Sequence, residues 1–404
     1  MRADGPLFRE SDFRRLWGVG LIAFFIRWLE ILAFGVFTYQ QTGSAFLVAG
    51  MIMLRLLPLA LFGVALGALA TRTRRQTGLI VLLTVLCGIA TALLVVSAFG
   101  QLAVWHLAVA SFVNGIAWAG DNPLRRGLIG DVAGPMRMGN AMALDVGASN
   151  ATRLAGPGIG GLLITHAGMT AVFGLVAALY LVALLAVLGV RDRRVPPDVS
   201  TMSLRVLLSA GFVAARASPR LAGTLWITIL FNLFGWPVLS MVPVIGQDRL
   251  GLAADGIGLL ASMDGLGTLL GAIALATFSR PSLYGRLYIG GVIVFLCALP
   301  MFALGTHPSV AAVALLVAGT GHAAFSVMQP TIVFVAVPVE RRVHAMGLLT
   351  MCIGTGPIGF VMLGWLADRL GASPAAVISA TAGLLVLAAS WPWWRACWRD
   401  GRVG

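Results

Sequence analysis

The chain has 404 residues, of which 59% are hydrophobic and only 11% are charged, whereas ordinary soluble domains are about 25% charged. So little polar surface excludes a soluble globular protein and indicates a protein that crosses a membrane many times. The net charge of +13 does not indicate a nucleic-acid partner, because the basic residues follow a membrane topology.

Apolar runs, each long enough to cross a hydrocarbon core of about 30 Å, recur from end to end. We expect helices, because backbone polar groups in lipid must find partners within their own segment. Twelve spans in two pseudo-symmetric bundles are therefore predicted, an all-α membrane protein with a six-helix bundle at 1–190, a linker at 191–219 and a second six-helix bundle at 220–404. The predicted spans are 16–39, 44–70, 76–98, 101–128, 139–165, 169–190, 220–247, 255–279, 283–304, 308–336, 343–369 and 374–395.

The distribution of arginines orients these spans. All 28 basic residues are arginines, and 23 of them fall in alternate connections and at the two ends of the chain. The intervening connections hold only Arg249 and Arg369. This positive-inside pattern predicts that both termini are cytoplasmic. The remaining arginines, Arg27, Arg55 and Arg153, lie inside spans.

A weak internal repeat relates the two halves. The segment MRMGNAM before the fifth span is similar to ERRVHAM before the eleventh, which places Arg137 and Arg341 204 residues apart. Each of these two spans then contains a Gly-Pro pair. Two parallel six-span halves with a binding site near the midplane describe the major facilitator architecture.

Several segments carry a resemblance to a known family, namely FRRLWGVG, TGSAFLVAG, GALATRTRR, NPLRRGLIGDV, NAMALDV and TRLAGPGIGG. Together they resemble the major facilitator superfamily over nearly the whole chain, and within it the branch of enterobactin-type siderophore exporters and macrolide-efflux proteins. The chain departs from the family's G-x-L-A-D-R loop, because Thr71 replaces the acid. Asp121 is the candidate to supply a carboxylate to Arg72 or Arg75 instead. A similar Leu-Ala-Asp-Arg stretch ends at Arg369, but it falls on the opposite side of the membrane and is interpreted as coincidental.

Charges inside the spans are the main functional signal, because they are costly in lipid and mark transport paths. Arg27 and Glu30 share one helix face, so Glu30 is either the partner of Arg27 in an internal ion pair or a proton-binding acid. The resemblance implies that the first, second, fourth and fifth spans face a central cavity, where Arg27, Glu30, Arg55 and Arg153 would converge. One carboxylate cannot neutralise three guanidinium groups, so the surplus predicts a carboxylate or phosphate ligand, which arginine binds in a bidentate manner. The alternative for Arg153 is a structural bond to backbone carbonyls freed at the Gly-Pro pair.

Other candidates have weaker signals. Asp264 is expected to be a second proton site, a partner of an arginine in the first half, or a residue of a helix contact. Asn232 and Trp236 line a pocket or contact lipid. The segment from Gly156 to Gly161 resembles the antiporter motif of the family. The predicted gating residues are Arg72, Arg75, Asp121, Asp145, Gly156 and Pro157.

No phosphate-binding loop, acid cluster of a nuclease or Ser/His/Asp arrangement is present in the sequence, so we expect neither an enzyme nor a bound metal or cofactor. The expected function is proton-coupled export of a small anionic or amphiphilic molecule, siderophore-like or a drug, by alternating access in the bacterial inner membrane. The expected partners are this substrate, protons and the lipid bilayer, and the expected state is a monomer. Two alternatives remain: an importer or facilitator of an anionic nutrient or lipid without proton antiport, and a membrane sensor that transports nothing.

Overall fold

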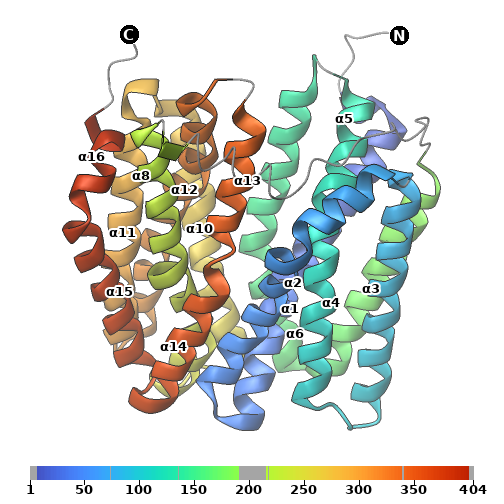
Figure 1. Ribbon diagram of the computed structural model, residues 1–404. Coiled ribbons are helices and arrows are strands. Elements are labelled where there is room, and N and C mark those ends of the chain that lie inside the picture. Colours follow the sequence, from blue (N-terminus) through green and yellow to red (C-terminus); the bar gives the residue numbers. More distant parts are fainter. Residues whose placement is uncertain are drawn as a thin grey trace. The chain divides into compact units, whose positions relative to one another are not determined.

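The structure, a computed structural model, describes residues 7–72, 74–134, 136–190, 215–216, 218–338 and 341–399, without the side chains of residues 63–72, 122 and 343. Every regular element in these ranges is a helix (Figure 1). Ten of the described helices are long and apolar enough to cross a membrane. One of them, α6 (Met138–Leu188), holds two spans joined at Gly168, whose φ of 74° and ψ of 179° are not helical. With the 18-residue helix α4 (Val104–Asp121), twelve spans result, and the predicted fold class is confirmed.

Contacts divide the chain into two compact units. Unit 1 comprises Met1–Phe37 and Leu54–Thr201, and unit 2 comprises Thr38–Met53 and Met202–Gly404. The bend between the first two helices therefore belongs to unit 2 although both helices continue into unit 1. The predicted linker, 191–219, lies almost wholly outside the described residues.

In unit 1, α3 packs along α6 and against α4. A 3₁₀ turn and a π-helical turn flank the long helices, and α5 continues from α4 through the π-helical turn η2. The predicted boundaries of these spans agree with the helices to within a few residues, except that the fourth span is extended by η2 and α5. The elements are η1 (Leu7–Arg9), α1 (Ser11–Thr42), α2 (Ala45–Arg72), α3 (Arg75–Ala98), α4, η2 (Asn122–Arg126), α5 (Gly127–Ala133) and α6.

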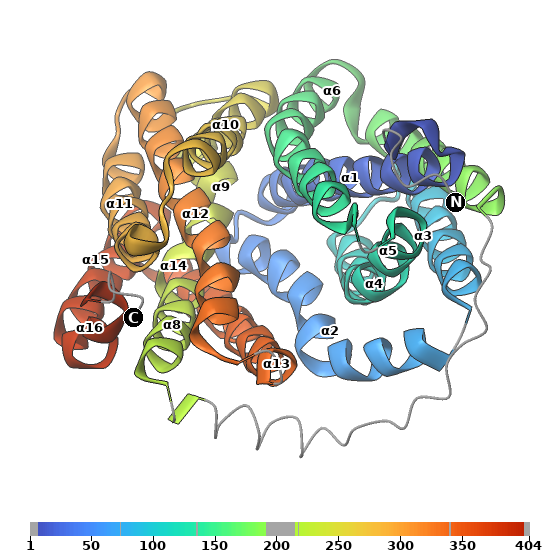
Figure 2. The same cartoon turned by 90° about the horizontal axis from the view of Figure 1, so that it is seen from above.

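In unit 2, α11 packs against α12 and α15, α10 packs against α12, and α8 lies beside α16 (Figure 2). The seventh predicted span is a composite in which a π-helical turn and a 3₁₀ helix separate two short α-helices. The elements are α8 (Pro219–Leu230), η3 (Phe231–Gly235), η4 (Trp236–Met241), α9 (Val242–Asp248), α10 (Ala254–Phe278), η5 (Pro281–Leu283), α11 (Tyr284–Leu304), α12 (Pro308–Ala336), α13 (Arg342–Ile353), α14 (Gly356–Leu370), α15 (Ala372–Ala389) and α16 (Trp391–Arg399).

The two Gly-Pro pairs have different local structures. Proline lacks a backbone donor, so it is tolerated at the start of a helix and bends or interrupts a helix elsewhere. Pro357 occupies the first turn of α14, and the chain is interrupted between α13 and α14. Pro157 instead lies inside α6, which continues through it.

A matched pair of glycines supports the internal repeat. A Cβ on Gly115 of α4 would collide with the Arg55 carbonyl oxygen of α2, and a Cβ on Gly319 of α12 would collide with the Asp264 carbonyl oxygen of α10. The two glycines are 204 residues apart, the same separation as the pair from which the repeat was predicted. Arg55 and Asp264 therefore hold equivalent positions in their units but carry opposite charges.

Candidate functional site

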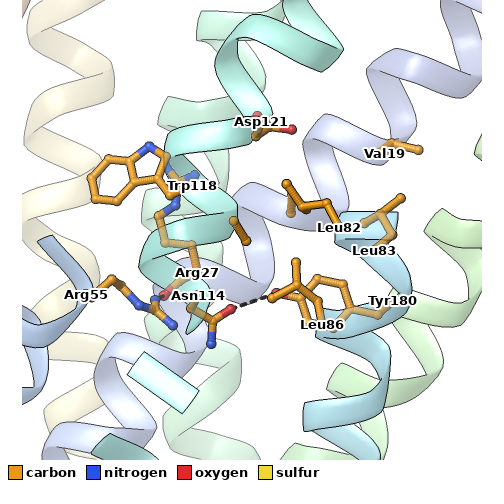
Figure 3. A pocket seen from close by; sticks show the side chains of 12 residues that line it. Val19, Arg27, Arg55, Leu82, Leu83, Leu86, Asn114, Trp118, Asp121 and Tyr180 are labelled. Carbon is orange, nitrogen blue, oxygen red and sulfur yellow. Dashed lines mark hydrogen bonds between the residues drawn. The ribbon is translucent and has the colours of Figure 1, made fainter. Parts of the chain in front are cut away.

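A small cavity lies in unit 1 among α1, α2, α3, α4 and the second span of α6 (Figure 3). Its apolar side comes mainly from α3, and its polar side comes from the other helices. The cavity is partly open, and the space that water can occupy in it is about 40 Å³, which is room for about three water molecules or one small acidic group. The lining residues are Val19, Ala23, Arg27, Arg55, Leu82, Leu83, Leu86, Asn114, Ala117, Trp118, Asp121 and Tyr180.

Arg55 and Glu30 form a buried ion pair beside this cavity. Their side chains are only 4% and 3% exposed, and an Nη of Arg55 donates to the Glu30 carboxylate. The other Nη of Arg55 donates to the backbone carbonyl of Arg27 at 3.1 Å. Of the two alternatives for Glu30, the internal pair with Arg27 is therefore wrong, because the partner of Glu30 comes from the neighbouring helix α2.

Two further polar side chains connect Glu30 to the cavity wall. The Tyr180 hydroxyl donates to the Asn114 side-chain oxygen at 3.3 Å, drawn as the dashed line in Figure 3. The Asn114 side chain is in turn hydrogen-bonded to Glu30. Neither residue is among those predicted from the sequence, although a polar side chain in the middle of an apolar run was an available signal for each.

Arg27 points to α4 and is held by aromatic rings. Its guanidinium carbon lies 4.2 Å from the centre of the Trp118 ring and 5.4 Å from that of Phe24. Such cation–π contacts stabilise the cation by about 0.5–2 kcal/mol and do not neutralise it. In the part of the chain that the structure describes, no carboxylate lies within ion-pair distance of Arg27.

A second group of charges lies between α4 and α6. Arg125 is completely buried, and it donates to both carboxylate oxygens of Asp121 (2.8 and 2.9 Å) and to Asp145 (2.5 Å). Arg126 donates to the other oxygen of Asp145 at 2.8 Å. Two arginines thus neutralise two aspartates. Gly20 of α1 allows this packing, because a Cβ there would collide with the Arg125 guanidinium.

This group corrects two sequence-based expectations. Arg125 was counted among the arginines of the connections that set the topology, but it is buried; the four-residue spacing from Asp121 was the signal for a pair. Asp121 does not pair with Arg75, whose Nη1 instead donates to Asp131 at 2.8 Å. The side chain of Arg72 lies outside the described residues.

Arg153 does not join the cavity. It is 8% exposed, and its guanidinium carbon lies 4.8 Å from the centre of the Trp28 ring. One turn later, a Cβ on Gly156 would lie 2.7 Å from the Trp28 Cβ and 3.1 Å from the Phe25 carbonyl oxygen. The structure therefore brings three of the four predicted charges together and holds Arg153 against α1.

The candidates of the second half lie in unit 2. Asn232 donates to the Thr228 carbonyl at 2.9 Å, and Trp236 contacts the ring of Phe360. Asp264 is 6% exposed. The binding and proton-coupling roles of Asn232, Trp236 and Asp264 stay predictions, as do the gating roles of Asp145, Gly156 and Pro157.

Unit 2 has an aromatic cluster at the start of its π-helical turn. The ring centres of Phe231 and His322 are 5.5 Å apart. Phe231 also stacks on Phe325 at 3.8 Å.

Among the described residues, no group of three or more His, Cys, Asp or Glu side chains is placed to hold a metal ion.

Comparison with known proteins gives a consistent result. The profile of the Major Facilitator Superfamily matches residues 16–359. The enterobactin exporter EntS of Shigella flexneri is 30% identical over 233 residues, 57% of this chain and 54% of the exporter, so the match spans about half the length of that relative. The macrolide efflux protein A of Streptococcus pyogenes is 19% identical over 380 residues, 92% of this chain and 93% of that protein.

Solved structures show the same fold at low identity. A bacterial homologue of the human lysosomal transporter Spinster, in an inward-facing and unoccupied conformation, matches with a TM-score of 0.76 and 16% identity over 97% of this chain and 98% of its own. The D323A mutant of the nucleoside transporter NupG matches with a TM-score of 0.77 and 14% identity over 94% of this chain and 99% of its own.

Proposed function

This chain belongs to the major facilitator superfamily, and we propose that it exports a small anionic or amphiphilic molecule in exchange for protons. It is a multi-pass membrane transporter and not an enzyme. The exporter and efflux names of its relatives support export as the direction and a siderophore-like acid or a drug as the substrate class. The alternation of arginines supports a bacterial inner-membrane location with cytoplasmic termini, and we expect a monomer that needs no cofactor.

The proposal of an anionic substrate rests mainly on Arg27. The charge pairs around the cavity are local: Arg55 with Glu30, and Arg125 and Arg126 with Asp121 and Asp145. The Arg27 guanidinium contacts aromatic rings, and Asp121, the acid that lines the same cavity, is paired with Arg125. A carboxylate or phosphate group of the substrate would neutralise this guanidinium and accept charge-assisted hydrogen bonds from it. The small volume accommodates the acidic group, while the rest of the substrate would lie against Trp118.

Glu30 is the proposed proton site. It is buried, it reaches the cavity through Asn114 and Tyr180, and its charge is balanced by one arginine. Exchange requires that bound substrate favours the ionised form of Glu30, by linkage between the two sites. A substrate with a hydrogen-bond donor or a cationic group beside its acid would satisfy this condition.

A second candidate function is uptake of an anion together with a proton, and the Arg55–Glu30 pair favours it. A substrate anion that takes Arg55 would leave Glu30 without its counter-ion, which favours the protonated acid. Anion and proton would then bind together and move in the same direction. The two candidates therefore differ in the sign of proton movement.

Binding of matched probes tests the anion site. The probes are benzenesulfonate, benzoate and phenyl phosphate, each compared with its neutral amide, and binding is measured by calorimetry on the purified protein. We expect the anions to bind more tightly than the amides and the Arg27→Gln variant to lose roughly tenfold to hundredfold in affinity. The control Arg14→Gln removes one exposed arginine that does not line the cavity. Equal binding of anions and amides would exclude the anion site.

Proton flux separates exchange from co-transport. Proteoliposomes loaded with a pH-sensitive dye receive the tightest probe on one side. Exchange moves protons toward the side of addition, whereas co-transport moves them away from it. Glu30→Gln should abolish this flux at normal protein levels, and substrate-driven flux that persists in this variant would show that Glu30 is structural.

A further inference from the structure

The bend between α1 and α2 belongs to unit 2 and is held by specific hydrogen bonds. We call the segment Thr38–Met53 the corner; it comprises the end of α1, the bend and the start of α2. Gly43 has a φ of +63°, which favours glycine, and its N–H closes α1 on the Tyr39 carbonyl at 2.8 Å. Ser44 then caps α2, because its hydroxyl accepts the Leu47 N–H at 3.2 Å.

Asp368, near the end of α14, places both carboxylate oxygens on the corner. One oxygen accepts the Ser44 hydroxyl at 2.8 Å, and the other accepts the Phe46 backbone N–H at 2.9 Å. The first N–H groups of a helix have no partner inside the helix, and the helix dipole favours a negative charge there. Asp368 therefore extends the cap of α2 from a different helix; the corner and the end of α14 lie side by side in Figure 1.

A second acid and a close backbone contact reinforce this junction. The Tyr39 hydroxyl donates to the carboxylate of Asp248, the last residue of α9. A Cβ on Gly364 would lie 2.9 Å from the Phe46 Cα and 3.0 Å from the Ala49 Cβ. Helix α14 can therefore approach α2 closely only with glycine at this position.

The neighbouring arginines are occupied elsewhere, so they do not neutralise the two acids. Arg369 lies over the Trp365 ring at 4.1 Å. Arg249 donates to two backbone carbonyls at the end of α11, at 3.0 and 2.8 Å. Both Asp248 and Asp368 line an open cavity with Tyr39 and Ser44. The corner is thus held mainly by hydrogen bonds to two carboxylates that solvent can reach.

We propose that Asp368 and Asp248 are gating residues that hold the corner, and that the corner is released when the transporter opens at this end of its helices. The inference rests on the proposed alternating access, in which each end must open once in a cycle. The corner is continuous with α1 and α2, which carry Arg27, Glu30 and Arg55, so its release would be passed directly to the cavity residues. The Leu-Ala-Asp-Arg stretch at the end of α14 then has a function and is not coincidental.

A distance measurement tests, without any substrate, whether Asp368 holds the corner. Spin labels are attached at Thr42→Cys and Leu370→Cys, two exposed positions on either side of the junction, in a full-length chain whose four native cysteines are replaced by serine. Pulsed electron resonance on the protein in lipid nanodiscs then gives the distribution of distances. We expect a predominant short-distance population in the parent chain and about a tenfold shift toward longer distances in Asp368→Ala.

Two companion variants keep the test decisive. Asp368→Asn retains an oxygen for the Phe46 N–H and an amide for Ser44, so a smaller shift is expected from the lost charge. Arg369→Ala changes the adjacent residue, whose guanidinium lies over Trp365 of the same helix, and should leave the distances unchanged. An unshifted distribution in Asp368→Ala, or an equal shift in Arg369→Ala, would overturn the inference. If the anionic probes do not bind but the spin-label distances still shift in Asp368→Ala, only the substrate proposal is refuted.

Discussion

Replacing Arg125 with glutamine should destabilise the protein more than any other single change among the charged residues of unit 1. The guanidinium is completely buried and makes three hydrogen bonds of 2.5–2.9 Å to two carboxylates. Arg126 still donates to Asp145 in the variant, so Asp121 is the carboxylate left without its partner. Removing one member of a buried pair costs about 3–5 kcal/mol, because the other charge stays buried and unpaired.

The control for this prediction is Arg126→Gln. Its side chain is 36% exposed and donates once to Asp145, so its loss should cost about 1 kcal/mol or less. The double variant Arg125→Gln with Asp121→Asn removes the orphaned charge together with its partner and should recover part of the loss, because the two effects are not additive within one network.

The assay is the thermal denaturation midpoint of each purified variant, followed by fluorescence-detected gel filtration. The expected order, from most to least stable, is Arg126→Gln, the double variant, and Arg125→Gln. If Arg125→Gln is as stable as Arg126→Gln, or if adding Asp121→Asn lowers the midpoint further, then the buried network does not carry the energy assigned to it.

Three further predictions concern the cavity. Glu30→Gln imitates the protonated acid, so exchange predicts weaker binding of anionic probes in calorimetry, whereas co-transport predicts roughly tenfold tighter binding because Arg55 is freed; unchanged binding would contradict any coupling between Glu30 and the anion site. Trp118→Ala removes the ring that holds Arg27 and should weaken probe binding by up to about tenfold, whereas Trp118→Phe should retain most of it. Gly115→Ala forces a Cβ against the Arg55 carbonyl and should lower the denaturation midpoint, unlike Gly147→Ala, where the same test finds open space.

Hydropathy, arginine alternation and the repeat were sufficient to predict the fold. Apolar runs directly indicate the segments that lie in lipid. The separation between Arg137 and Arg341 is also the separation between Gly115 and Gly319, which make equivalent helix contacts in the two units. The merging of two spans in α6 and the interruption at Pro357 were not predictable, because they depend on how neighbouring helices support the backbone.

The charged side chains around the cavity were predicted from the sequence, but their pairing was not, and their roles in transport stay predictions. The cost of charge in lipid identified Arg27, Glu30 and Arg55, yet the sequence cannot show which guanidinium meets Glu30, since this depends on the direction of side chains on two helices. Proximity in sequence favoured Arg27, whereas packing of α2 against α4 placed Arg55 there. Arg125 was counted with the arginines of the connections because it lies near the end of a predicted span, where burial depends on tertiary contacts.

The central claim is that Arg27 binds the acidic group of the substrate, and an anomalous-scattering experiment tests it most directly. Crystals of the protein are grown with 4-bromobenzenesulfonate, and the bromine is located from its anomalous signal. The account predicts bromine beside Trp118 with the sulfonate at hydrogen-bond distance from Arg27, and no such peak in Arg27→Gln. A peak outside the cavity, or one that persists beside Trp118 in the Arg27→Gln variant, would contradict it.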